Sequence, residues 1–259
     1  MLEKLKGCLL EKAGEAIDGS AREMPTRFRH SLHETVEHDF HIELSLLACA
    51  SSLWCGGDEY LGMPAAVGSL LLRAGIASHM GTSGLPDVFS ASPGSGNGDE
   101  TLAILTGDGL IALGMEYLAG NGGRHSSRLV AEAVRALGSR GVLAGYSLGL
   151  DRVSGIETAS PDGRADFELY SGQLARFASH GGALLAGATG LMQDDAAQIG
   201  LLTGRARFLS ELSEREDDRE RKSEMIFQAR TLIEQAQTIA GNRENSTLFT
   251  SLMYLSDFF

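Results

Sequence analysis

Apolar residues recur at helical spacing in nearly every segment of this 259-residue chain, and strict two-residue alternation is absent. A helix with this period buries one face, so the sequence predicts an all-α fold, a helical bundle. The length and a 43% hydrophobic composition suit a single domain spanning residues 1–259. Residues 1–25 are expected to form a peripheral N-terminal helix that ends before Pro25, since proline disfavours helix in the residue before it.

Turn residues divide the pattern into successive helices. We expect them at Leu2–Ile17, Ser31–Trp54, Tyr60–His79, Glu100–Ala119, Ser126–Gly138, Gly141–Leu150, Asp166–Ala188, Ala196–Arg215, Lys222–Ala240 and Ser246–Phe259. Gly81–Gly98 and Asp151–Asp162 are predicted loops. The first is longer than compact domains usually contain, which indicates a functional or a disordered segment, and disorder is the default interpretation.

Charge and cysteine content exclude several classes of protein. A net charge of −12 argues against a nucleic-acid partner, because neutralising phosphates needs a dense basic face. Three cysteines, Cys8, Cys49 and Cys55, form no even disulfide framework, and no export signal is evident. A cytoplasmic protein is therefore expected. The apolar windows Ile42–Cys55 and Met63–Ala77 are too short, or interrupted by Arg73, for a membrane span.

The segment Thr101–Ala119, TLAILTGDGLIALGMEYLA, carries an Ala-Ile-Leu-x-Gly-Asp element at the start of a core helix. It resembles a signature of the trans-isoprenyl diphosphate synthases, the polyprenyl synthetase family. From that anchor the resemblance extends from about Ser31 to the C-terminus at low identity. It implies an isoprenoid-synthase-like helical bundle. The matching aspartate, Asp108 after Gly107, is mainly a buried structural hydrogen-bonder at a helix start in that family, which favours a structural role here.

Members of this family ionise an allylic diphosphate and couple it to isopentenyl diphosphate. The leaving group needs about three Mg²⁺, which two facing Asp-Asp-x-x-Asp motifs hold. The first motif should begin at His79, where the histidine remains and no aspartate follows in Met80, Gly81, Thr82 and Ser83. The second should fall at Glu211, Leu212, Ser213, Glu214 and Arg215, where one glutamate survives at an expected position and Arg207-Phe208 replaces the usual Phe-Gln.

The basic residues that the resemblance implies are missing as well. The element that holds isopentenyl diphosphate corresponds to Asp39–Leu44, which contains acids and neutral residues. The Lys-Thr pair appears as Gly172-Gln173 and the Gly-Gln pair as Gly145-Tyr146, and Ser90–Gly98 has no counterpart of the Arg-Arg pair. Both degenerate motifs therefore lack catalytic and metal-binding residues, and we expect neither a catalytic residue nor a metal or other cofactor.

Other candidate motifs have plainer explanations. Asp194-Asp195 mimics part of the second motif, but it lies too early and lacks a third acid, so a solvated helix start is favoured. His33, Glu37 and His41 could share one helix face in the His30–His41 cluster, as a transition-metal set or, preferably, a solvated face. The acidic run Glu211–Glu220 indicates a solvated helix with surface ion pairs.

Two remaining patterns give no catalytic site. Gly94–Glu100 is glycine-rich before a helix but has no preceding strand and no Gly-Lys-Ser/Thr, so it is a weak phosphate loop. The cysteines lack a supporting base, and no Gly-x-Ser-x-Gly element occurs.

The favoured function is a non-catalytic or regulatory subunit of a heteromeric polyprenyl diphosphate synthase in isoprenoid biosynthesis. Such a pseudoenzyme would be inactive alone and would pair with a catalytically competent subunit, or form a homodimer, through Tyr60–Ala77 and Glu100–Ala119. One alternative is an active prenyltransferase or terpene-type enzyme with a non-standard Mg²⁺ site. The other is a protein that binds an apolar isoprenoid chain in the cavity of the bundle.

Overall fold

The computed structural model describes residues 1–20, 24–37, 42–80, 100–153, 164–214, 216–241 and 246–254, and no strand occurs in these ranges. The first helices are α1 (Leu2–Gly19), α2 (Thr26–Glu37), α3 (Ile42–Trp54), the 3₁₀ helix η1 (Glu59–Gly62), α4 (Met63–Met80) and α5 (Glu100–Asn121). They are followed by η2 (Gly123–His125), α6 (Ser126–Leu137), α7 (Val142–Val153), α8 (Arg164–Leu185), α9 (Gly190–Glu214), α10 (Arg219–Ala240) and α11 (Thr247–Tyr254). The predicted all-α fold is confirmed.

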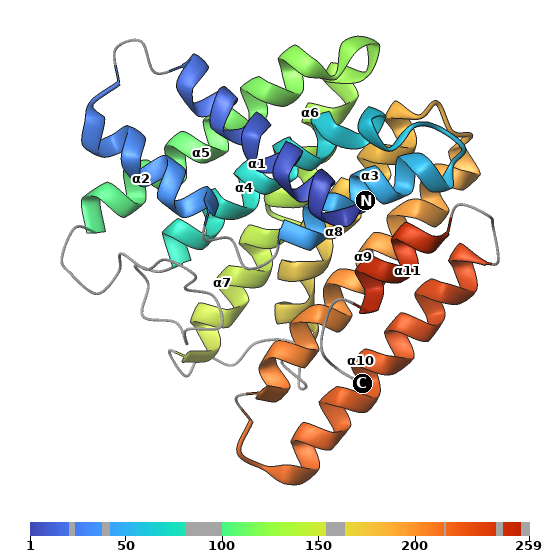
Figure 1. The fold of residues 1–259 in the computed structure, drawn as a ribbon. Helices are drawn as coiled ribbons and strands as arrows, with labels where there is room; N and C mark the ends of the chain where they lie inside the picture. Colours follow the sequence, from blue (N-terminus) through green and yellow to red (C-terminus); the bar gives the residue numbers. More distant parts are fainter. Residues whose placement is uncertain are drawn as a thin grey trace.

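Helices α3, α4 and α8 form the centre of the bundle. Nearly every residue of α3 and α4 is buried, and α8 packs against both. Outside them α5 packs along α4, α9 along α8, and α10 along α9 (Figure 1). Helix α1 adds Leu5, Leu9 and Ile17 to the same hydrophobic core.

Close backbone contacts hold the central helices together. Gly182 of α8 lies against the backbone carbonyl of Ala48 in α3, so closely that a Cβ at residue 182 would overlap it. At the C-terminal end of α3, Trp54 Nε1 donates a hydrogen bond to the Ala240 carbonyl at 2.9 Å. The Trp54 ring also meets Phe249 edge-on, with ring centroids 5.8 Å apart. The C-terminal helices are thus attached to the centre of the bundle.

The largest departures from the predicted boundaries are the start of α2, at Thr26 instead of Ser31, the break between α2 and α3, and the start of α9. The single helix expected at Ser31–Trp54 is two helices, because α2 ends at Glu37 and α3 begins at Ile42. The two differ in environment: α2 buries only Leu32 and Val36, whereas α3 is buried on nearly all sides. Helix α9 begins at Gly190 instead of Ala196, after a Thr189 hydroxyl that accepts from the Met192 N–H at 3.5 Å.

Both predicted loops differ from the structure or lie outside it. Helix α7 runs on to Val153, so residues 151–153 are helical, and the rest of that loop lies outside the described residues together with Gly81–Gly98. The acidic run Glu211–Glu220 is not one helix, because α9 ends at Glu214 and α10 begins at Arg219. Asp218 caps α10 by accepting from the N–H groups of Glu220 and Arg221 at 3.0 and 2.9 Å.

Candidate functional site

The C-terminal end of α4 carries the histidine of the first degenerate motif, and it lies against α5. His79 Nε2 is 3.2 Å from Asp108 Oδ1. Gly107 makes this approach possible, because a Cβ at that position would overlap the His79 ring. The structure thus brings together His79, Gly107 and Asp108, which the sequence assigned to two separate motifs. Met80 is buried, and Gly81, Thr82 and Ser83 lie outside the described residues.

The expectation that Asp108 is buried at a helix start is wrong. Helix α5 begins at Glu100, so the N–H groups around Asp108 belong to the helix interior and need no side-chain cap. The Asp108 side chain is 68% exposed and its partner is the ring of His79. Asp108 therefore faces outward from the bundle.

The second degenerate motif lies in the last turns of α9, where Glu211 is bound by arginine. Arg207 Nε is 3.0 Å from Glu211 Oε1, and the Glu211 side chain is only 22% exposed. Arg73, a buried residue of α4, adds a second positive charge near the same carboxyl group. Burial raises the pKa of Glu211 to about 7, against the lowering effect of Arg207 and Arg73, and Glu214 contributes to the rise.

The other residues of this motif are not arranged as ligands. Leu212 is half-buried, and the buried Ser213 hydroxyl donates to the Ser210 carbonyl at 2.6 Å. Glu214 is exposed, and Arg215 lies outside the described residues.

These residues do not fit a magnesium cluster. Mg²⁺ needs several carboxylate or phosphate oxygens in octahedral geometry. Here the Glu211 oxygen that would serve as a ligand already accepts from a guanidinium. Within the ranges that the structure describes, no group of three or more His, Cys, Asp or Glu side chains is placed to hold a metal ion. At the C-terminal end of α9, Glu211 therefore forms an ion pair with Arg207 of the same helix.

Comparison with solved structures places this geometry in a known fold. The chain is similar to a deletion mutant of the heterotetrameric geranyl pyrophosphate synthase of mint, with 22% identity, a TM-score of 0.70 and coverage of 96% of this chain and 98% of that one. It is also similar to the geranyl diphosphate synthase small subunit of Antirrhinum majus, with 22% identity, a TM-score of 0.64 and the same coverage.

A geranylgeranyl pyrophosphate synthetase from the archaeon Geoglobus acetivorans matches with 14% identity, a TM-score of 0.76 and 97% coverage of both chains. The chain has the fold of the trans-isoprenyl diphosphate synthases. No protein-family model and no curated protein sequence matches it. The similarity therefore lies in the path of the backbone, which is retained across nearly the full length of each chain.

Within this synthase fold, the positions expected to bind diphosphate are used for packing. Glu43, at the start of α3, lies 2.9 Å from Lys6 Nζ of α1, and this bond raises the pKa of Lys6. Gly172 of α8 packs against Leu201 and Arg205 of α9. Gly145 is buried and Tyr146 packs against the core. Residues 38–41 and 90–98 lie outside the described residues.

Of the histidine cluster, the structure describes His30 and His33. His33 Nε2 lies 3.1 Å from Asp18 Oδ1 of α1, and His30 Nε2 is 4.0 Å from Glu34 of its own helix. His38 and His41 lie outside the described residues, so the set His33, Glu37 and His41 is untested. The contact with Asp18 joins α1 to α2.

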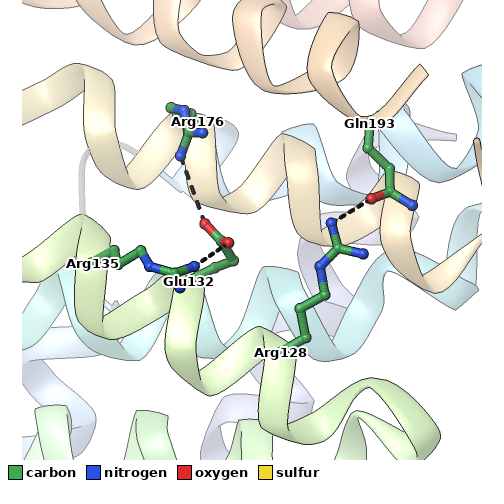
Figure 2. Close-up of polar contacts among 5 residues, drawn as sticks. All are labelled: Arg128, Glu132, Arg135, Arg176 and Gln193. Atoms are coloured by element: carbon green, nitrogen blue, oxygen red, sulfur yellow. Dashed lines mark hydrogen bonds and ion pairs between the residues drawn. The ribbon is translucent and has the colours of Figure 1, made fainter. Parts of the chain in front are cut away.

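Asp194 and Asp195 lie next to a structural polar network. Figure 2 shows Arg128 of α6 reaching Gln193 of α9, whose Oε1 accepts at 2.8 Å, while Glu132 lies between Arg135 and Arg176. Gln193 also donates to the Ala188 carbonyl at 2.7 Å. Asp194 is exposed and Asp195 half-buried in the second turn of α9. These contacts connect α6, α8 and α9, and they agree with the structural interpretation.

The environment of Cys49 argues against a role as a nucleophile. Cys49 is buried in α3, and burial raises the pKa of its thiol to about 12. Cys8 and Cys55 are half-buried thiols. A thiol at pKa 12 carries almost no reactive thiolate near neutral pH.

Helix α5 exposes an apolar face. By length and composition, Glu59–Met80 and Glu100–Asn121 would both be apolar enough to cross a membrane, but 78% of the first is buried in the bundle against 33% of the second. On α5, Ile104 is 45% and Leu105 52% exposed. The predicted interface is therefore wrong for Tyr60–Ala77, which lies inside the bundle. Glu100–Ala119 has a face on which a partner could pack.

Sequence reasoning missed the role of two arginines. Arg73 is the one charged residue between Met63 and Ser78, and a single cation in an apolar helix indicates a buried partner of opposite charge. Arg207 stands four residues before Glu211, which is the spacing of an ion pair on one helix face. Both signals were present in the sequence.

Proposed function

We propose that this chain is a non-catalytic, regulatory subunit of a heteromeric polyprenyl diphosphate synthase, and that it acts in the cytoplasm. It would pair with a second subunit that retains both aspartate motifs and would change the length of that subunit's product. On this proposal the chain alone is inactive and binds no cofactor.

The observation that carries the proposal is the ion pair at Glu211. The one acid that survives at an expected position of the second motif is bound by Arg207 and lies near Arg73. Ionising an allylic diphosphate requires free carboxylates that can share Mg²⁺ with the leaving group. Glu211 is bound by arginine and the sequence Met80–Ser83 contains no aspartate, so neither expected motif supplies free carboxylates for Mg²⁺.

Two further observations support a partner. The similar mint protein is described as heterotetrameric and the similar Antirrhinum majus protein as a small subunit. The exposed apolar face of α5 also needs an explanation, because large exposed apolar patches on soluble proteins usually mark interaction sites.

The decisive experiment compares the pure chain with the same chain co-expressed with a synthase that carries both aspartate motifs. The pure chain should not consume an allylic diphosphate and isopentenyl diphosphate in the presence of Mg²⁺. The co-expressed pair should co-purify and give a different distribution of product lengths from the synthase alone. Turnover by the pure chain at a rate unaffected by further purification would disprove the proposal and favour an active enzyme.

Two matched variants test whether the exposed face of α5 contacts the partner subunit. Leu105→Asp, on the exposed face of α5, should abolish co-purification. Phe227→Asp changes a residue of α10 that is 71% exposed and lies on another helix, so it should leave the complex intact. Equal loss of binding in both variants, or in neither, would mean that α5 is not the contact surface.

A further inference from the structure

Positive charge gathers on and around α6, although the chain as a whole is acidic. Residues 117–150 contain four arginines and one acid, Glu132, so this stretch has a net charge of +3 in a chain of net charge −12. The four arginines, all exposed, are Arg124, Arg128, Arg135 and Arg140. A local concentration of cations attracts anions to that part of a protein surface. The outer face of α6 therefore favours an anionic ligand.

Helix α8 contributes a further arginine and a buried histidine where it packs against α6. Arg176 and His180 are four residues apart, so they lie on one face of α8. Leu129 Cδ2 of α6 is 3.2 Å from the position that a Cβ on Gly181 would occupy, which means that the two helices touch beside His180. The basic face of α6 and the face of α8 with Arg176 thus meet at one junction.

The two arginines at this junction keep most of their hydrogen-bond donors uncommitted. Arg128 donates one N–H to Gln193 Oε1 of α9 at 2.8 Å, whereas Arg176 lies 3.9 Å from Glu132 Oε2, too far for a hydrogen bond (Figure 2). A guanidinium has five N–H donors in a planar fork that matches two oxygens of a phosphate group. Both side chains can therefore bind a tetrahedral anion without breaking an existing hydrogen bond.

His180 adds a buried polar atom that is not hydrogen-bonded. The residue is 5% exposed, and within the described part of the chain its Nδ1 has no hydrogen-bond partner. Burial lowers the pKa of His180, and Arg128 and Arg176 lower it further, against the opposite effects of Glu132 and Asp194. The ring is therefore neutral near neutral pH and lies in the field of both arginines. An unsatisfied buried polar atom is costly and calls for a ligand or an ordered water.

We propose that Arg128, Arg176 and His180 bind a tetrahedral dianion of the phosphate class at the junction of α6, α8 and α9. The two guanidiniums hold its oxygens, and the histidine takes up a proton and donates from Nδ1. Gln193 is a positioning residue, because its own side-chain amide donates to the Ala188 carbonyl and so presents Oε1 to Arg128.

The charges at the junction balance when a dianion is bound. Arg128, Arg135 and Arg176 face the carboxylates of Glu132 and Asp194, which leaves one positive charge. Protonation of the histidine adds a second, and a dianion neutralises both. Glu132 stays bound by Arg135 and does not compete for the ligand. This site is independent of the subunit with which the chain pairs.

Isothermal titration calorimetry of the full chain with inorganic diphosphate tests the site. The wild type should bind one diphosphate per chain, and Arg128→Gln and Arg176→Gln should each weaken binding by about tenfold or more. Arg140→Gln is the matched control, because it removes the same charge from the same basic stretch outside the junction. It should bind like the wild type. Equal weakening in all three folded variants would overturn the proposal, since the anion would then follow the general charge of α6.

Sulfate tests the part of His180, because sulfate remains a dianion between pH 5 and pH 8. If binding raises the pKa of His180 by one unit or more, the wild type should bind sulfate about tenfold more tightly at pH 5 than at pH 8. Nitrogen-15 shifts of the His180 ring should report the uptake of a proton when sulfate is added. His180→Asn should lose most of this pH dependence. An unchanged pH dependence in folded His180→Asn would overturn its role as a ligand.

Vesicles distinguish a free anion from a lipid headgroup as the source of the phosphate group. Co-sedimentation with phosphatidylcholine vesicles that contain phosphatidic acid, lost in Arg128→Gln and kept in Arg140→Gln, would support the same site with a headgroup as its ligand. Binding of neither diphosphate nor these vesicles by the wild type would overturn the inference. It would leave the proposed function intact, since co-purification with a synthase and inactivity of the pure chain do not depend on this junction.

Discussion

Replacing Glu211 by glutamine should remove a distinct pH dependence of stability. Burial raises the pKa of this carboxyl group from 4.5 to about 7 in the folded protein. A raised pKa means that the folded state holds its proton more tightly than the unfolded state. The stabilisation that this proton gives is therefore fully present below pH 4.5 and is lost as the pH rises through 7.

The magnitude follows from the size of the shift. A difference of about 2.5 pKa units corresponds to roughly 3.4 kcal/mol between the fully protonated and the fully ionised limits. Between pH 5 and pH 9 the linkage relation gives a loss of about 2.5 kcal/mol in the free energy of unfolding. Glutamine does not titrate, so Glu211→Gln should lack this loss and gain stability relative to the wild type as the pH rises.

Urea denaturation at pH 5, 7 and 9, followed by helical circular dichroism, measures the difference between the two proteins. Glu220→Gln, at an exposed position of α10 that is not among the groups acting on the pKa of Glu211, is the control and should retain the wild-type pH dependence. Parallel stability curves for the wild type and Glu211→Gln would refute the reasoning. They would mean that Arg207 and Arg73 balance the cost of burying the carboxylate, so that its pKa is the same folded and unfolded.

Two backbone contacts give further predictions, both measured as free energies of unfolding in urea. Gly107→Ala should destabilise the protein by about 1–3 kcal/mol, because the new Cβ displaces the ring of His79. Gly120→Ala lies in the same helix, but its Cβ meets nothing within 4 Å. This control substitution should therefore stabilise the protein by up to about 1 kcal/mol. Gly182→Ala should cost about 3 kcal/mol or more, since the Cβ would overlap the backbone carbonyl of Ala48, which no side-chain rotation can relieve. Equal effects at residues 107 and 120 would show that the His79 contact is unimportant.

Helical period and turn residues were sufficient to predict most of the fold. The helix expected at Glu100–Ala119 is observed at Glu100–Asn121, and that expected at Ser126–Gly138 at Ser126–Leu137. Both are bounded by glycine or by other turn residues that can be read directly. The division between α2 and α3 was missed because the apolar period continues through Ser31–Trp54 while the degree of burial changes, and burial depends on the neighbouring helices.

The candidate site was predicted less completely than the fold. The sequence identified His79 and Glu211 as remnants of two motifs, but it could not supply the partners that now hold them. Asp108 meets His79 only because α5 packs along α4, and Arg73 of α4 acts on Glu211 of α9 only because the bundle folds as a whole. These are contacts between residues far apart in the chain, and no local pattern reports them.

The internal ion pairs also show how the acids at the expected motif positions are accommodated. An acid left behind at a former metal site would be an unpaired charge in a partly buried place, which is costly. Here Glu211 is bound by Arg207, and Glu43, in the segment where a diphosphate-binding element was expected, is bound by Lys6. Each of these two glutamates is therefore paired with a basic side chain of the same chain. A carboxylate introduced at residue 80 would be buried, and Glu211 would remain bound to arginine, so this change alone should not create a metal site.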